Sequence, residues 1–279
     1  PGWKWIRKVR GMDVPGLSLR ELRPINCIAI DNVHTRKIIL QDWHIAEEYV
    51  YGIKKSFLSP GYAIRNIAKS YGLEDEGGLL AEAFTQAFRE IDSFYAFQEE
   101  SMRKILESIF GDRKPIIVTC RTAGGKTLAF LLPILLYILK TKKAGREGTK
   151  AILFYPTKAL INDQAGTILR LVWHTNKVLK AAEGHVVSIG ILHGDIPDRE
   201  NLCNYEEDIM LGIKCPECNK GMLFLGVKQI HASDQRTWAE ERIYCSNAEC
   251  PCNRGSELGE LLNSTLKAVR DAIYASPPD

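Results

Sequence analysis

The stretch that decides the fold of this chain is Pro115-Ile-Ile-Val-Thr-Cys-Arg-Thr-Ala-Gly-Gly-Lys-Thr-Leu-Ala-Phe130. Its β-branched apolar run predicts a buried strand over 116–120, and the apolar residues after Thr127 predict a helix. Between them, Gly124 and Gly125 allow a tight turn with closely spaced backbone N–H groups. Such a turn at a helix N-terminus is typical of a phosphate-binding loop, because the N–H groups and the helix dipole both favour an anion.

The side chains that follow the glycines have the chemistry that ATP with Mg2+ requires. A lysine at position 126 can reach the terminal phosphates, and the hydroxyl of Thr127 can ligate Mg2+. Cys120 stands where the commonest pattern has glycine, so the match is to the looser A-x-x-G-x-G-K-T form, with an ordinary Gly-Lys-Thr turn as the alternative. The residues expected to contact the nucleotide are Arg121, Thr122, Ala123, Gly124, Gly125, Lys126 and Thr127, the last two with a catalytic role.

Composition predicts an ordinary globular protein. The chain has 279 residues and 31.4 kDa, with 45% hydrophobic and 25% charged residues, which allows one large domain or two small ones. A net charge of +3 does not by itself predict a polyanionic partner.

The longest apolar run, 128–139, is shorter than the roughly 20 residues of a membrane span. We therefore expect no membrane partner and a cytoplasmic location, nucleoid-associated if the source is bacterial. The first residue is not Met, and we expect the chain to be part of a longer protein.

From residue 93 the pattern alternates between strand and helix, which predicts an α/β fold with a parallel sheet flanked by helices. Strands are expected at 116–120, 151–155 and 186–192, and helices at 159–179 and 257–275. Residues 1–92 are expected to form an α+β N-terminal accessory region, with a hairpin from 26–31 and 36–43 and helices at 59–70 and 79–91. We assign the α/β domain to two segments, 93–202 and 256–279. The residues between them, 203–255, are expected to form an insertion.

Two further motifs flank the glycine turn. The segment Phe94-Tyr-Ala-Phe-Gln98 opens a helix, and a glutamine amide can pair with the edge of adenine, although Gln98 as a plain surface residue is the alternative. Pro156-Thr-Lys-Ala-Leu-Ile-Asn-Asp-Gln164 follows the second expected strand, at the sheet edge where ligands of α/β proteins gather. Thr157 is also expected to cap the helix that follows.

In this order, FYAFQ (94–98), CRTAGGKT (120–127) and FYPTKALINDQ (154–164) resemble the Q motif, motif I and motif Ia of superfamily 2 helicases. The similarity is to the first RecA-like domain of DExH/DEAD-box-type members, over roughly 94–200 and 256–279. The segment 190–199 resembles a turn of Hrq-type and MrfA-type helicases, with His193 where an aspartate is common. This resemblance implies a P-loop RecA-like fold, with Gln98 as the adenine reader and with Thr157 and Lys158 as contacts to a nucleic-acid backbone.

The resemblance implies an ATP-dependent helicase or translocase acting on nucleic acid, DNA rather than RNA. The implied partners are a second RecA-like domain of the same parent chain and proteins of DNA repair or antiviral defence. The sequence contains no apolar strand ending in D-E-x-H or D-E-A-D, so we expect residues 1–279 to bind ATP without hydrolysing it. If hydrolysis does occur, Asp195 and Glu206 are the first candidates for the carboxylate. The alternative function is a non-catalytic docking module for nucleic acid or protein.

Five of the eight cysteines lie between positions 215 and 252. Cys215-x2-Cys218 and Cys245-x4-Cys250 have the spacing of two knuckles that converge on one tetrahedral Zn2+. The second knuckle resembles half of the zinc ribbons of DNA ligases and topoisomerases, which favours Cys250 over Cys252 as fourth ligand. Chance cysteines or a redox C-x-x-C pair are the alternatives. The insertion is therefore predicted to be a zinc ribbon.

Overall fold

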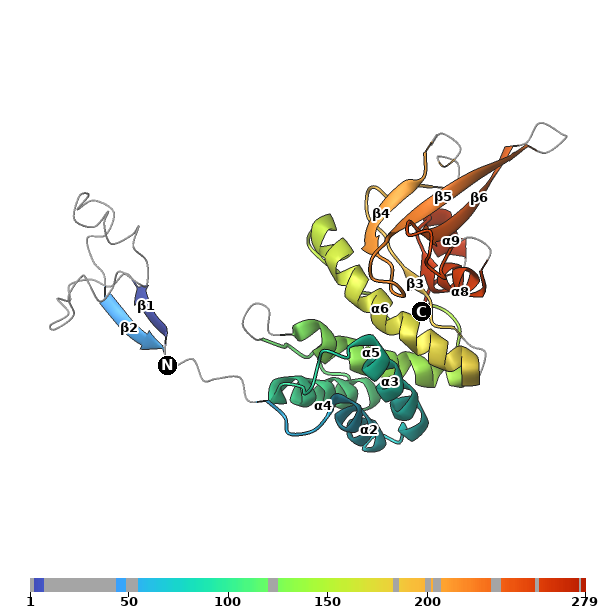
Figure 1. The fold of residues 1–279 in the computed structure, drawn as a ribbon. Helices are drawn as coiled ribbons and strands as arrows, with labels where there is room; N and C mark the ends of the chain where they lie inside the picture. Colours follow the sequence, from blue (N-terminus) through green and yellow to red (C-terminus); the bar gives the residue numbers. More distant parts are fainter. Residues whose placement is uncertain are drawn as a thin grey trace, which may run out of the picture. The chain divides into compact units, whose positions relative to one another are not determined.

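The computed structural model describes residues 55–119, 125–182, 186–198, 202, 207–231, 237–253, 256–275 and 277–279, and the strands at 3–7 and 44–48 (Figure 1). The chain divides into two compact units, Pro1–Lys54 and Lys55–Asp279. In the first unit, β1 (Trp3–Arg7) pairs antiparallel with β2 (His44–Glu48). The hairpin predicted at 26–31 and 36–43 lies outside the described residues.

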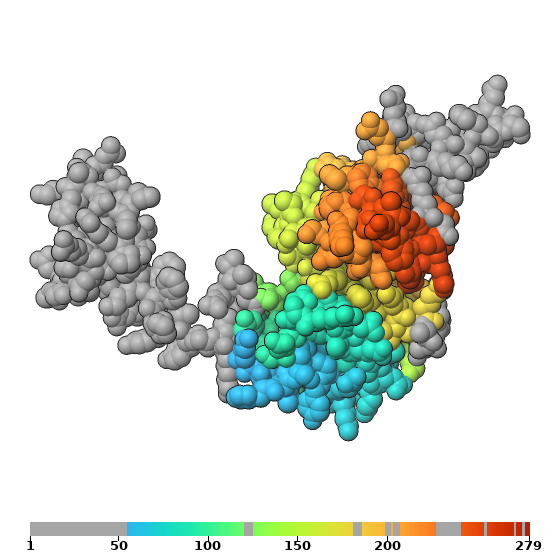
Figure 2. All heavy atoms as spheres, viewed as in Figure 1, coloured from blue at the N-terminus to red at the C-terminus, as the bar shows by residue number. Residues whose placement is uncertain are grey.

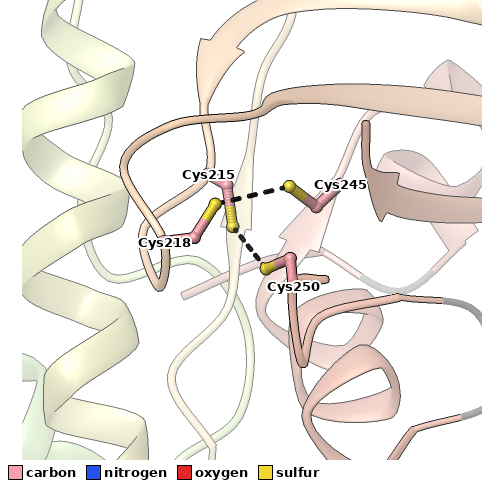
Figure 3. Close-up of side chains that lie close together, drawn as sticks. All are labelled: Cys215, Cys218, Cys245 and Cys250. Carbon is pink, nitrogen blue, oxygen red and sulfur yellow. Dashed lines mark hydrogen bonds between the residues drawn. The ribbon is translucent and has the colours of Figure 1, made fainter. Parts of the chain in front are cut away.

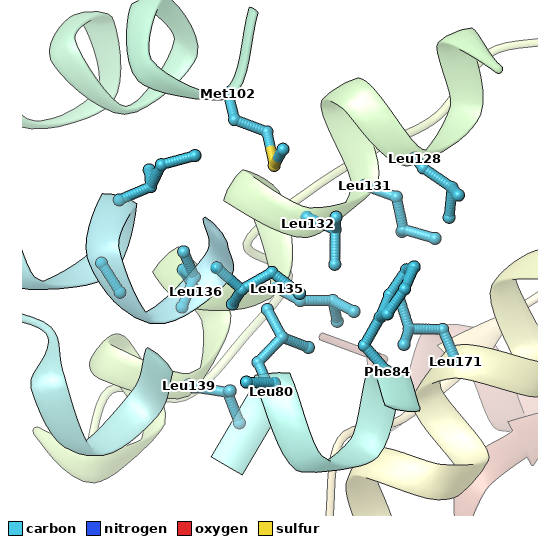
Figure 4. Close-up of a cluster of buried hydrophobic side chains, with 14 of the residues drawn as sticks. Leu80, Phe84, Met102, Leu128, Leu131, Leu132, Leu135, Leu136, Leu139 and Leu171 are labelled. Atoms are coloured by element: carbon cyan, nitrogen blue, oxygen red, sulfur yellow. The ribbon is translucent and has the colours of Figure 1, made fainter. Parts of the chain in front are cut away.

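The second unit begins with a layer of helices. These are α2 (Pro60–Lys69), α3 (Glu74–Ala87), α4 (Ala96–Phe110), α5 (Lys126–Lys143) and α6 (Lys158–Ala182). Apolar residues at three- and four-residue spacing place one face of each helix in a common core, as Figure 4 shows for Leu80, Phe84, Met102 and Leu132. The predicted domain boundary at 92/93 falls inside this unit, because α2 and α3 contribute to the same core as α4 to α6. None of the described helices is both long enough and apolar enough to cross a membrane.

Helix α3 starts five residues before the helix predicted at 79–91. Glu74, Asp75 and Glu76 occupy its first turn, where negative charge is stabilised by the helix dipole. Gly77 then lies against α2, and a Cβ atom at this position would be only 2.3 Å from the Cβ of Ala68. The glycine therefore permits close packing of the two helices, which offsets its low helix propensity.

The expected parallel sheet is present, but it has only two short strands in the described residues. Strand β3 (Ile189–Gly190) pairs parallel with β7 (Leu266–Lys267), while 116–119 and 151–155 form no strand. The prediction of strands there was wrong for this structure, because a strand needs a hydrogen-bonded neighbour. Within the described residues, the segment 151–155 has no strand beside it, and its backbone is bonded only at its start. There the N–H groups of Lys150 and Ala151 donate to the carbonyl of Asp279.

The helix predicted at 257–275 is divided in two. Helix α8 (Glu257–Thr265) ends where β7 joins the sheet, and α9 (Arg270–Ala275) follows. Pairing with β3 therefore overrides the continuous helical pattern, since Leu266 is buried in the core when it is part of the strand.

The cysteine-bearing insertion forms an antiparallel sheet of three strands, in the order β4 (Ile209–Lys214), β5 (Met222–His231) and β6 (Thr237–Cys245). A second core joins this sheet to α6 and α8. Helix α6 belongs to both cores, because Leu171 and Val172 face the helical layer while Leu169 and Trp173 face the sheet. Figure 2 shows the blue-to-green helices on one side of the yellow α6, and the orange strands with the red C-terminal segment on the other.

A buried asparagine fixes α6 to the parallel sheet. Asn176 is fully buried, and its amide nitrogen donates to the carbonyl of Val187 and to Oγ1 of Thr265, both at 2.8 Å. Its amide oxygen accepts from the N–H of Val187, also at 2.8 Å. One side chain therefore satisfies backbone groups next to β3 and a hydroxyl on α8.

Replacing Asn176 is expected to destabilise the protein. Asn176→Leu leaves the N–H and C=O of Val187 buried without partners, which we expect to lower the free energy of unfolding by about 2 kcal/mol. Urea denaturation followed by circular dichroism measures the change. Asn66→Leu, at an exposed position of α2, is the matched control and is expected to change stability by less than about 0.5 kcal/mol. Equal effects of the two substitutions would contradict the assigned role of Asn176.

Candidate nucleotide and nucleic-acid site with a cysteine cluster

Helix α5 begins at the predicted phosphate-binding lysine. Gly125 precedes it in the left-handed conformation, with φ of 77° and ψ of 31°, and Lys126 and Thr127 are the first two helical residues. Backbone N–H groups of the first turn have no partners within the helix, so this end of the 18-residue helix favours an anion. The other residues predicted to contact the nucleotide, Arg121 to Gly124, lie outside the described residues.

Gln98 lies directly against this turn. Its side chain is buried, its Oε1 accepts from the N–H of Tyr95 at 2.8 Å, and its Nε2 donates to the carbonyl of Gly125 at 2.8 Å. A Cβ atom on residue 125 would come within 2.7 Å of this nitrogen. Gln98 is therefore not a plain surface residue, and here it holds the glycine turn. Contact of Gln98 with adenine stays a prediction.

The hydroxyl of Thr127 has a partner that sequence reasoning did not assign. It donates to Oε1 of Gln164 at 2.6 Å, joining the first turn of α5 to the second turn of α6. Gln164 is part of the motif quoted above, but its position on a helix gave no signal that it faces another helix. The contact became visible only in the folded chain.

Thr157 and Lys158 lie at the start of α6. The Oγ1 atom of Thr157 accepts from the N–H of Leu160 at 3.3 Å, so the residue caps the helix as predicted. Lys158 forms an ion pair with Asp195, and both side chains are exposed. Two features thus favour an anion at this end of α6, the helix dipole and the ammonium group.

Asp195 and His193 form the turn after β3. The hydrogen bond from Lys158 lowers the pKa of Asp195, and the N–H of Asp195 donates to Nδ1 of His193 at 3.2 Å. Burial lowers the pKa of His193. Asp195, one of two carboxylates considered for catalysis, therefore lies beside the predicted nucleic-acid contact. The other, Glu206, is outside the described residues.

Four of the five cysteines between positions 215 and 252 meet at one end of the antiparallel sheet (Figure 3). The turn between β4 and β5 carries Cys215 and Cys218, and Cys245 ends β6 opposite Leu223 of β5. This register brings the two knuckles together. All four sulfur atoms, including that of Cys250, lie within 4.8 Å of one another.

The sulfur geometry fits a tetrahedral metal site. Cys215 and Cys250 have their sulfur atoms 3.6 Å apart, as do Cys218 and Cys245. Zn–S bonds of about 2.3 Å in a tetrahedron place the sulfurs about 3.8 Å apart, whereas a disulfide would require about 2.05 Å. Burial opposes the thiolate of Cys218, but hydrogen bonds from the backbone of Gly221 and Lys220 lower its pKa to about 6. The fifth thiol, Cys252, is buried outside this group of four, and its N–H donates to the sulfur of Cys250.

The first knuckle is also bound to α6. Glu217, between Cys215 and Cys218, accepts from Nε1 of the buried Trp173 at 2.7 Å and pairs with Lys177 at 3.0 Å. Burial raises the pKa of Glu217, but these two donors lower it overall. The cysteine cluster is therefore bound to α6, the same helix that has Thr157 and Lys158 at its start.

Comparison with known proteins agrees with these motifs. Residues 95–194 match the model of the DEAD/DEAH box helicase family. The chain is similar to the Druantia protein DruE of Escherichia coli, with 35% identity over 33% of this chain and 5% of DruE. It is also similar to the human ATP-dependent RNA helicase DDX18, with 30% identity over 35% of this chain and 12% of that protein. A third relative is the probable ATP-dependent RNA helicase pitchoune of Drosophila melanogaster, with 29% identity over 35% of this chain and 14% of that protein.

These alignments span less than a fifth of each relative. No solved structure matches the chain. The matched region includes Gln98, Lys126, Thr127, Thr157 and Lys158, so it contains the glycine turn and the start of α6. Over residues 95–194, the chain is therefore similar to DEAD/DEAH box helicases.

Proposed function

We propose that this chain binds ATP with Mg2+ at the start of α5 and a nucleic-acid backbone at the start of α6, as one half of a helicase or translocase motor. The observation that carries the proposal is the direct bond between Thr127 and Gln164. It joins the helix that begins at the phosphate-binding turn to the helix that begins with Thr157 and Lys158. A motor has to couple two such sites, and this hydrogen bond between the two helices supports the proposal.

The residues present fit a bound nucleotide. Gly125 adopts the left-handed conformation that opens the turn, and Lys126 and Thr127 stand at the positive end of a long helix. When ATP and Mg2+ are bound, they supply the reactive phosphate and the charge that neutralises it. The chain contributes orientation, with Lys126 toward the terminal phosphates and the hydroxyl of Thr127 toward the metal.

The nucleic-acid contact is proposed to be independent of sequence. A threonine hydroxyl and a lysine ammonium bind phosphate oxygens and read no bases, as a stepping motor requires. We favour DNA over RNA as the substrate, and a second RecA-like domain as the partner that completes the nucleotide site. The Hrq-type and MrfA-type subfamily, and a role in repair or defence, belong to this proposal on the resemblance of residues 190–199.

We further propose that the cysteine cluster holds one Zn2+ and is a zinc ribbon inserted in the motor domain. Its four thiols have the separation of a tetrahedral site, and Glu217 connects the first knuckle to α6. The ribbon would then stabilise the helix that carries the nucleic-acid contacts. If instead the chain is a docking module without nucleotide chemistry, nucleic acid will bind and ATP will not.

Binding of single-stranded DNA tests the contact at α6. Lys158→Ala is expected to weaken binding by about 3- to 10-fold and to reduce the slope of log K against log salt by about 0.7, because one phosphate contact is lost. Asp195→Asn is expected to tighten binding severalfold, because the carboxylate no longer competes with phosphate for Lys158. Titration of labelled oligonucleotides at two salt concentrations measures both.

Lys180→Ala is the matched control, since Lys180 is also on α6 and is also paired with a carboxylate, that of Glu257. This substitution is expected to leave binding unchanged. If Lys158→Ala and Lys180→Ala have the same effect, the start of α6 is not the contact. The same oligonucleotide made of RNA shows which nucleic acid is preferred.

A further inference from the structure

The hydroxyl of Thr127 is bound differently from those of four other helical threonines in the structure. Thr85, Thr141, Thr175 and Thr265 each donate to the backbone carbonyl four residues earlier in their own helix. Thr127 is the second residue of α5 and has no such helical carbonyl. It donates instead to a side chain 37 residues later in the sequence, Oε1 of Gln164 at 2.6 Å.

The orientation of the Gln164 amide follows from its second partner. Nε2 of Gln164 lies 2.9 Å from Oδ2 of Asp163. An ionised carboxylate only accepts hydrogen bonds, so the NH2 group of the amide must face Asp163 and the oxygen must face Thr127. An amide oxygen has no proton to donate, and therefore the hydroxyl of Thr127 must supply the proton of the 2.6 Å bond.

This direction of donation matters for a metal. A hydroxyl that ligates Mg2+ offers an oxygen lone pair and must turn its proton away from the ion. With its proton committed to Gln164, the Oγ1 atom of Thr127 has lone pairs directed elsewhere. Both side chains are only partly buried, so the pair does not lie in the core.

We propose that Gln164 is a positioning residue, which holds the Thr127 hydroxyl in the orientation that ligates the Mg2+ of bound nucleotide. The inference rests on the proposed ATP site. It adds that the first two turns of α6 and the metal ligand are linked through one side chain, since Gln164 lies in the second turn of the helix that starts at Lys158. A shift of α6 when nucleic acid binds would then change the orientation of the ligand.

The test compares ATP binding with and without the metal. Isothermal titration calorimetry on the full chain is carried out in Mg2+ and again in EDTA. Gln164→Leu keeps the helix propensity and removes the acceptor, and it is expected to weaken binding of Mg-ATP by about 3- to 10-fold. Binding of metal-free ATP is expected to stay within about twofold of wild type, because the free nucleotide does not need the hydroxyl of Thr127.

A double-mutant cycle separates positioning from general damage. Thr127→Val removes the hydroxyl and keeps the shape, so Gln164→Leu is expected to have no further effect on Mg-ATP binding in that background. Gln86→Leu, a glutamine of α3 that bonds Glu82 on its own helix, is the matched control and should leave both affinities unchanged.

The outcomes distinguish the inference from the function on which it rests. Equal loss of affinity in Mg2+ and in EDTA, or additive effects of Thr127→Val and Gln164→Leu, would overturn the positioning role while ATP binding stands. If wild type binds no nucleotide under either condition, the ATP site itself is refuted and the role of Gln164 with it.

Discussion

Loss of the metal from the cysteine cluster is expected to unfold the β4–β6 sheet. Binding of zinc to four thiolates contributes about 10 kcal/mol or more in small zinc domains, far above the net stability that a sheet of three strands supplies alone. The purified chain should contain close to one zinc per molecule. Cys250→Ser is expected to lose the metal. Cys252→Ser is expected to retain it because the sulfur of Cys252 is not among the four that meet, although its thiol lies beside Cys215 and raises the pKa of that residue. Metal analysis by atomic emission, with limited proteolysis of 207–253 before and after chelation, measures both effects.

The comparison of Cys250 with Cys252 is well matched, because both residues are buried cysteines and they lie two positions apart in the sequence. A wild-type protein without metal would remove the ribbon from the proposal. Equal zinc loss in the two variants would show that Cys252 contributes as much as Cys250. Because Glu217 binds Trp173 and Lys177, chelation should also loosen α6, which hydrogen exchange at 169–180 would detect.

Lys126→Ala is expected to weaken ATP binding by about 10- to 100-fold. At the proposed site, the lysine at the start of α5 would contact phosphate through charge-assisted hydrogen bonds, each with about 1.5–3 kcal/mol of binding free energy. The chain is also expected to release no phosphate at steady state, because phosphoryl transfer needs a carboxylate near Mg2+ and charge from a second domain. Calorimetry and a phosphate-release assay measure the two properties separately.

Lys114→Ala is the control for Lys126→Ala, since Lys114 is an exposed lysine paired with Asp112 outside the helices. ATP affinity that does not change in Lys126→Ala would contradict the site and favour the docking module. Hydrolysis by wild type that disappears in Lys126→Ala would instead reveal a catalytic carboxylate within residues 1–279. Asp195 is the first to replace in that case, although it is held by Lys158 in this structure.

Local patterns in the sequence predicted several of the helices and brought together the residues of the candidate sites. The apolar spacing of three and four residues predicted α2 and α6 within a few residues, since a helix is stabilised by bonds within one segment. Glycines followed by lysine and threonine marked the start of α5, and the cysteine spacing marked four thiols that the fold brings together. Each of these signals lies within a short stretch of chain.

Tertiary structure decided the contacts between distant residues. The β-branched run at 116–119 reads as a strand, but strand formation depends on a neighbour that the local sequence does not specify, and none pairs with it in the described part of the chain. For the same reason, the sequence named Gln98 and Asp195 without their partners Gly125 and Lys158. It also gave Gln164 no role, because the hydrogen bond to Thr127 exists only when α5 and α6 pack together.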